Sequence, residues 1–93
     1  MNRSSVRARA GVIRTPGECA TVFMAKSEPV VVELLDITGR VVRELLRQRL
    51  AAGASSIFWD LKDAGGFAVH PGMFFVRLSS SSGHSVSRFA VLR

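Results

Sequence analysis

The sequence predicts an all-β domain, an antiparallel sandwich or barrel, and three observations support this prediction. Short apolar runs rich in valine, isoleucine and phenylalanine recur along the chain. Clusters of glycine, proline, serine and aspartate separate these runs at intervals of about ten residues. No segment shows a convincing helical period over the length of a typical helix. The chain has 93 residues, which suits one small domain with a modest core.

The first 17 residues differ in composition from the rest of the chain. They hold four arginines and no acidic residue, and they end at Pro16-Gly17. We therefore expect residues 1–17 to be a flexible basic leader or a linker remnant, and residues 18–93 to form the domain. This segment is positively charged but has no apolar stretch of the kind found in signal peptides. We expect the chain to be part of a longer protein.

The first two strands are expected at residues 19–26 and 30–37. The second run, VVVELLDI, is the stronger signal, because consecutive β-branched side chains disfavour a helix. Its alternating face of Val30, Val32 and Leu34 is wholly apolar and is predicted to point into the core.

The segment after Thr38-Gly39 is ambiguous. An apolar run, a short glycine-containing turn and a second apolar run are typical of a hairpin, so we expect a strand at 40–46 followed by a loop. The spacing of Val42, Leu45 and Leu46 also fits a helix over 41–52.

The second half of the chain predicts three further strands, at 55–60, 73–78 and 85–92, with a brief strand at 67–69. SSSSGH at residues 79–84 is expected to be a flexible turn. Alternation within these runs and the run at 30–37 predicts a core of eight residues. These residues are Val30, Val32, Leu34, Ile57, Trp59, Phe74, Val76 and Leu78.

Four apolar residues are expected on the face opposite this core: Leu35, Phe58, Phe75 and Phe89. Exposed apolar residues on a thin sandwich often mark a protein contact. A slip of one residue in the assumed alternation would instead place them in the core.

No residue pattern indicates an enzyme or a cofactor. Asp60, Asp63 and Gly66 could be a weak calcium site, but the following residues contain no glutamate to close one. Turn formation explains these three residues more simply, and also explains Asp36 and Gly72. His70 and His84 lack ligand partners at metal-binding spacing, and the single cysteine, Cys19, excludes an internal disulfide.

The net charge of +6 leaves a nucleic-acid or polyanion role open. A sheet that reads nucleic acid needs aromatic residues interleaved with basic ones on an exposed face. Only Phe75 beside Arg77, and Arg88 beside Phe89, fit that pattern. A basic tail with a solvated face explains the charge more simply, so nucleic acid is not the expected partner.

Taken together, the motifs resemble a known family. In order they are VVVELLDITGRVVRELL, LAAG, IFWDLKDAGG, VHPGMFFVRL and VSRFAVLR. This order and spacing, over about residues 19–93, looks like the FlgD-type Ig-like domain and the similar C-terminal sorting domains of type IX secretion. Phe74 replaces the tyrosine usual in the family, and Phe89 stands where a lysine is usual.

The resemblance implies an Ig-like, fibronectin-III-like sandwich of about seven strands with Trp59 as a core anchor. It implies a non-catalytic module that helps to sort, secrete or attach a larger exported bacterial protein at the cell surface. The expected partner is a protein, either secretion machinery or a neighbouring domain. Recognition is expected through sheet edges and the terminal strand, and the candidate residues are Gly39, Arg40, Phe75, Arg88, Phe89, Val91 and Arg93. A structural spacer or self-associating assembly module is the alternative.

Overall fold

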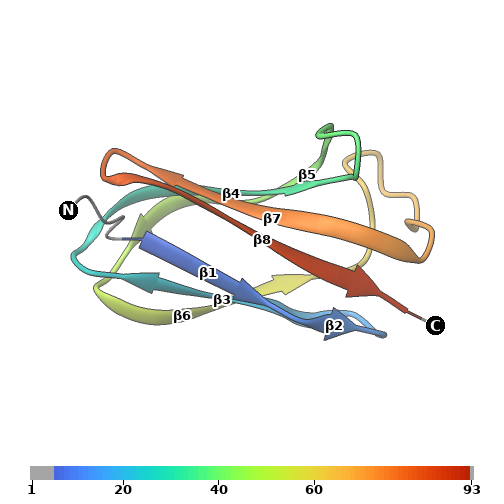
Figure 1. Ribbon diagram of the computed structural model, residues 1–93, viewed down its shortest axis with the longest axis horizontal. Helices are drawn as coiled ribbons and strands as arrows, with labels where there is room; N and C mark the ends of the chain where they lie inside the picture. Colours follow the sequence, from blue (N-terminus) through green and yellow to red (C-terminus); the bar gives the residue numbers. More distant parts are fainter. Residues whose placement is uncertain (1–5, 93) are drawn as a thin grey trace.

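The structure, a computed structural model, describes the backbone of residues 6–92 and the side chains of residues 11–92. It is all-β, and its strands lie in two layers, as predicted (Figure 1). One sheet has the order β1 (Val6–Ala10), β3 (Gly17–Met24), β6 (Gly53–Trp59). The other has the order β2 (Val12–Ile13), β8 (Gly83–Val91), β7 (Gly72–Ser80), β4 (Glu28–Leu35), β5 (Val41–Leu50). The described residues form no helix that is long and apolar enough to cross a membrane.

Strands β1 and β2 correct the expectation of a flexible leader. β1 pairs antiparallel with β3, from Val6 opposite Met24 to Ala10 opposite Ala20. After Gly11 the chain crosses to the other sheet, where β2 runs parallel to the end of β8. The sequence VRARA at residues 6–10 alternates apolar or small residues with arginine, which is the period of an edge strand with one face toward a core. The expectation is wrong for residues 6–13, and residues 1–5 lie outside the described residues. Because β1 and β2 form one strand that changes sheets, the sandwich has seven strand positions.

The core lies between the two sheets. All eight residues expected there are buried, together with others contributed mainly by β3 and β8. The Trp59 ring meets Phe74 and Phe89 edge to face, with ring centroids 5.5 Å and 6.0 Å apart. Its Nε1–H donates to the Lys62 carbonyl at 2.9 Å, so the indole is hydrogen-bonded although it is only 2% exposed.

Phe89 and Val91 are buried, so the expectation that they face a partner is wrong. Directly opposite residues in an antiparallel pair share a face of the sheet. In the β7–β8 hairpin, Phe89 lies opposite Phe74, which points into the core. Leu35, expected on the outer face, lies there opposite Phe75 and outside the core cluster, although it is only 7% exposed. Phe58 is 65% exposed.

The serine run at residues 79–82 closes a tight hairpin. Ser80 pairs with Gly83, so only Ser81 and Ser82 form the turn between β7 and β8. Both hydroxyls donate to the carboxylate of Glu28, at 3.0 Å from Ser81 and 2.7 Å at closest from Ser82. These bonds, led by that of Ser82, and the nearby Lys26 charge hold the pKa of Glu28 below its usual value. They also tie the β7–β8 turn to the start of β4.

The segment after Gly39 is a strand through Leu50, not a helix and not a strand that ends at residue 46. β5 pairs with β4 along its whole length, with irregularities at Val32/Glu33 and Leu34/Leu35. These irregularities disturb the alternation of apolar residues, which explains why the sequence also fits a helical period.

Candidate protein-recognition surface

The β4–β5 turn is built around Asp36. Its Oδ1 accepts hydrogen bonds from the Thr38 N–H at 2.9 Å, the Thr38 hydroxyl at 2.6 Å and the Arg40 N–H at 3.0 Å. The Gly39 N–H donates to the Asp36 carbonyl, and Gly39 has φ +86°. The Thr38 hydroxyl above all, and then the Arg40 N–H, lower the pKa of Asp36. The carboxylate is therefore occupied in shaping the turn.

The same arrangement occurs a second time at Asp63. Its Oδ1 accepts from the Gly65 N–H at 2.9 Å and from the Phe67 N–H at 3.0 Å. The Gly66 N–H donates to the Asp63 carbonyl, and the Asp63 N–H donates to the Phe67 carbonyl. The segments DITGR and DAGGF thus form matching five-residue loops, each with an aspartate first and a glycine of positive φ fourth.

Asp60 joins the two sheets at the same end of the sandwich. Its Oδ1 accepts from the Lys62 N–H and from Arg43 of β5, the latter at 2.9 Å. The same Arg43 nitrogen donates to the Lys62 carbonyl at 2.9 Å. Partial burial acts to raise the pKa of Asp60, but these bonds outweigh it and the pKa is lowered.

The three aspartates therefore serve loop geometry. Among residues 11–92, no three His, Cys, Asp or Glu side chains come together as a metal-binding group. Cys19 is buried in the core, and burial raises the pKa of its thiol from 9.0 to about 11. A thiol with so high a pKa is a poor nucleophile at neutral pH.

Four residues form a row across the outer face of the larger sheet. Val41 of β5 lies opposite Leu35 of β4, Leu35 lies opposite Phe75 of β7, and Phe75 lies opposite Arg88 of β8. Neighbouring strands are about 4.8 Å apart, so this outer row spans about 14 Å. Arg88 and Val41 are exposed, and Phe75 is half-buried.

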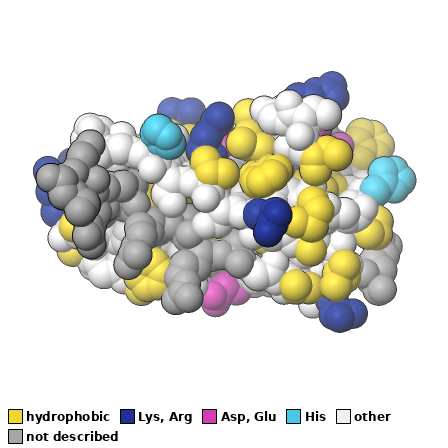
Figure 2. All heavy atoms as spheres, in the orientation of Figure 1, with side chains coloured by type: hydrophobic (Ala, Val, Ile, Leu, Met, Phe, Trp, Pro, Cys, Tyr) yellow, Lys and Arg dark blue, Asp and Glu magenta, His cyan; other side chains and the backbone are white. Residues whose placement is uncertain are grey.

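Exposed apolar side chains surround the outer row at the loop end of the sandwich. Ile37 in the β4–β5 turn and Phe67 in the second aspartate loop are each 72% exposed, and Met73 at the start of β7 is also exposed. A hollow of about 660 Å³ lies between the β4–β5 turn and residues 67–74. Figure 2 shows hydrophobic side chains gathered on the half of the molecule toward the end of β8. We call the outer row, the β4–β5 turn and residues 67–73 the loop-end surface.

The structure brings together four of the residues expected to recognise a partner. Phe75 and Arg88 belong to the outer row, and Gly39 and Arg40 stand directly before its first member. Phe89 and Val91 point into the core beneath, and Arg93 lies outside the described residues. β7 pairs along the whole length of β8, and on the other side of β8 the short strand β2 pairs with Ala90 and Val91 at its end.

Sequence reasoning missed Ile37, Phe67 and Met73 as surface residues. Ile37 is the second residue of the first aspartate loop, and Phe67 is the fifth residue of the second, where its N–H donates to Asp63. An apolar residue within or directly after a D-x-x-G loop has no strand neighbour to cover it, and that is the signal that could have found them.

Comparison with solved structures places this fold inside much larger proteins. The chain is similar to part of dimeric latent PorU from Porphyromonas gingivalis, with a TM-score of 0.64 and 28% identity over 86% of this chain. It is also similar in fold to part of PorZ, with a TM-score of 0.52 and 24% identity over 80% of this chain. PorZ is described as an essential surface component of the type IX secretion system of that bacterium. The match spans only 8% of PorU and 9% of PorZ.

No family model and no curated protein matches the chain. The FlgD-type resemblance therefore stays a prediction, whereas the Ig-like sandwich is the observed architecture.

Proposed function

We propose that the chain is a non-catalytic module that sorts, secretes or attaches a larger bacterial protein at the cell surface through type IX secretion. The observation that carries the proposal is the similarity to PorU over most of this chain and only a small part of PorU. A fold that makes up so small a share of a long protein is consistent with an accessory module that helps to sort or attach the rest of that protein. The PorZ description adds the link to type IX secretion.

The loop-end surface is the proposed contact with the partner. Its apolar centre and basic rim, with Arg40 and Arg88, have the composition of an interface that buries a few apolar anchors within polar surroundings. Its shape is fixed by the two aspartate loops and by the sheet pairing, so little conformational entropy is lost on binding. No catalytic role is proposed, since Asp36, Asp60 and Asp63 are engaged in loop hydrogen bonds.

The test is export of a reporter. Residues 1–93 are fused to the C-terminus of a reporter that carries a signal peptide, in a bacterium with type IX secretion, and reporter is measured at the surface and in the medium. The fusion needs the whole chain because β1 and β2 are part of both sheets. Deleting β8 would be uninformative, because removing buried Phe89 and Val91 would unfold the domain.

The surface is tested by reversing charge at its rim. The double variant Arg40→Glu with Arg88→Glu is expected to lose export while keeping its melting temperature. Arg49→Glu, an exposed position at the far end of β5, is the control and should be exported normally. Periplasmic retention of a folded wild-type fusion contradicts the secretion role. Normal export of the double variant contradicts the proposed surface alone.

A further inference from the structure

Strand β6 is an open sheet edge that lacks the usual protection. It ends the sheet order β1-β3-β6, and within residues 6–92 it pairs only with β3. Natural edge strands are commonly blunted by charged residues, proline or bulges. The edge strand of the other sheet, β5, follows that rule with three arginines and a glutamate. The seven residues of β6, GASSIFW, contain no charge and no proline.

The sequence of β6 is complementary to itself in the antiparallel direction. When two copies pair about Ser56, Trp59 lies opposite the partner's Gly53, Phe58 opposite the partner's Ala54 and Ile57 opposite the partner's Ser55. Each large side chain meets a small one, and the two Ser56 side chains meet on the two-fold axis. Cross-strand neighbours of this kind pack without a steric clash.

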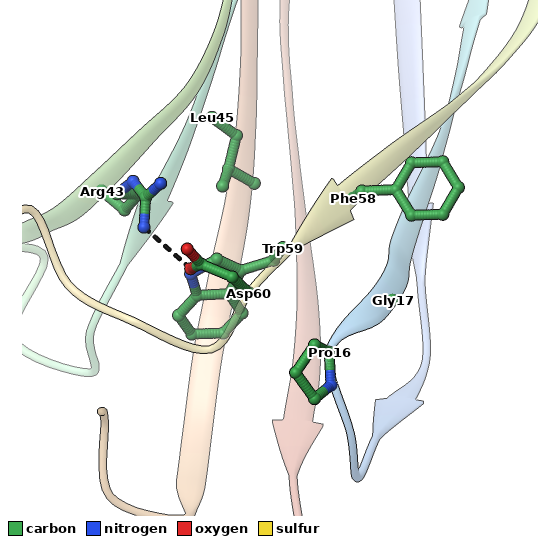
Figure 3. A pocket seen from close by; sticks show the side chains of 7 residues that line it. All are labelled: Pro16, Gly17, Arg43, Leu45, Phe58, Trp59 and Asp60. Carbon is green, nitrogen blue, oxygen red and sulfur yellow. Dashed lines mark hydrogen bonds and ion pairs between the residues drawn. The ribbon is translucent and has the colours of Figure 1, made fainter. Parts of the chain in front are cut away.

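The surroundings of β6 fit the same arrangement. Phe58 is 65% exposed on the outer face of its sheet, while Trp59 points into the core. Figure 3 shows these two rings leaving β6 on opposite sides, beside a hollow of about 370 Å³ that is also lined by Pro16 and Leu45. The register ends at Trp59, because β6 ends there and Asp60 is paired with Arg43.

We propose that β6 binds a second copy of this chain, edge to edge, to form a two-fold dimer with one continuous six-stranded sheet. Each partner contributes the three strands of its smaller sheet. Such an interface is isologous and closes with two copies, so it does not lead to fibres. The contacting strand carries no charge, which distinguishes this edge from β5, with its three arginines and one glutamate.

The net charge of +6 gives the dimer a distinctive dependence on salt. Two copies repel each other at long range, and the Debye length falls from about 30 Å at 0.01 M salt to about 3 Å at 1 M. Dimerisation is therefore expected to strengthen as salt rises. Binding to an acidic polymer would weaken over the same range.

The first experiment is sedimentation of the full chain at increasing concentration, up to about 1 mM, where even weak dimers are detected. Ser56→Lys places two like charges opposite each other on the axis and should lower the dimer affinity by at least about tenfold. His84→Lys adds a similar charge at an exposed position on β8, in the other sheet, and should leave the dimer intact. A chain that stays monomeric throughout at high salt, or a dimer that survives Ser56→Lys, overturns the proposal.

The second experiment reads the register directly and does not depend on the lysine variant folding. Opposite residues in a strand pair have Cα atoms about 4.5–5.5 Å apart, within the range of a disulfide. Ser56→Cys is expected to oxidise rapidly to a covalent dimer, and His84→Cys to do so far more slowly. The native Cys19 can remain, because it is buried. Equal rates for the two variants count against the register.

The dimer and the secretion role are independent. Ser56→Lys is expected to leave export of the reporter fusion unchanged if the loop-end surface alone contacts the machinery. Failure of export with an intact dimer therefore rejects only the secretion role.

Discussion

Trp59 shows how a single side chain links the two sheets of this small domain. Its ring packs between Phe74 and Phe89 of the facing sheet, and its Nε1–H closes a bond to the loop that follows. We expect Trp59→Ala to lower the free energy of unfolding by about 3–5 kcal/mol, because it leaves a cavity and removes the bond. Urea denaturation followed by circular dichroism measures this loss.

The neighbouring residue is the matched control. Phe58 is also aromatic and on the same strand, but it is 65% exposed. Phe58→Ala should change the stability of the dilute protein by no more than about 0.5 kcal/mol. Similar losses for the two variants would mean that Trp59 is not the core anchor.

At the scale of single residues, alternation places most of the core but not its last strand. The run MFFVRL has one wholly apolar face, so Phe74, Val76 and Leu78 follow from the sequence alone. In VSRFAVL, the choice of which alternating side chains point into the core depends on which residues form the preceding turn. Once the turn is known to be Ser81 and Ser82, the pairing of Phe74 with Phe89 fixes the inward face. The burial of Glu28 could not be foreseen, because its partners lie more than 50 residues away.

At the scale of elements, the two aspartate loops are the part that sequence reasoning describes best. The sequence predicts Asp36, Asp60 and Asp63 in turns, and their carboxylates accept backbone N–H bonds there. Such turns depend on residues within four positions of one another, so local sequence determines them. The two edge strands β1 and β5 are harder to predict from the sequence, because arginines are common both in edge strands and in flexible segments.

The β4–β5 turn also allows a test of backbone conformation separately from side-chain clashes. Gly39 has φ +86°, and a Cβ built on it meets no atom within 4 Å. Gly39→Ala should therefore cost about 1–2 kcal/mol of stability from the left-handed conformation alone. Gly11 is the control, because it has equally open space around it but no positive φ. Gly11→Ala should be close to neutral in the same denaturation experiment, and equal effects would contradict the turn geometry.

At the scale of the whole molecule, the sandwich is held closed by a strand that belongs to both sheets. β1 flanks β3 in one sheet, and β2 flanks the end of β8 in the other. The Ala90 N–H donates to the Gly11 carbonyl and the Leu92 N–H donates to the Ile13 carbonyl, each at 3.0 Å. The first and last segments of the domain are thereby joined, and buried Ile13 belongs to the common core.

Removing residues 1–13 should therefore unfold or strongly destabilise the domain, rather than trim a flexible leader. A loss of even 3 kcal/mol would lower the melting temperature by about 12–24 °C in a domain of this size. A small domain has a total free energy of unfolding of only about 5–15 kcal/mol, so this loss would be a large fraction of it. The truncated chain should also show weaker hydrogen-exchange protection in β3 and β8, the strands that lose a neighbour.

A control variant distinguishes the effect of β1 strand pairing on stability from the effect of the β1 charges. Replacing Arg7 and Arg9 by glutamine keeps the β1 backbone and removes two positive charges, so this variant should melt close to the wild type. If the truncated chain melts like the wild type, residues 6–13 do not contribute to the fold. If the glutamine variant melts as low as the truncated chain, charge rather than strand pairing holds the first strand in place.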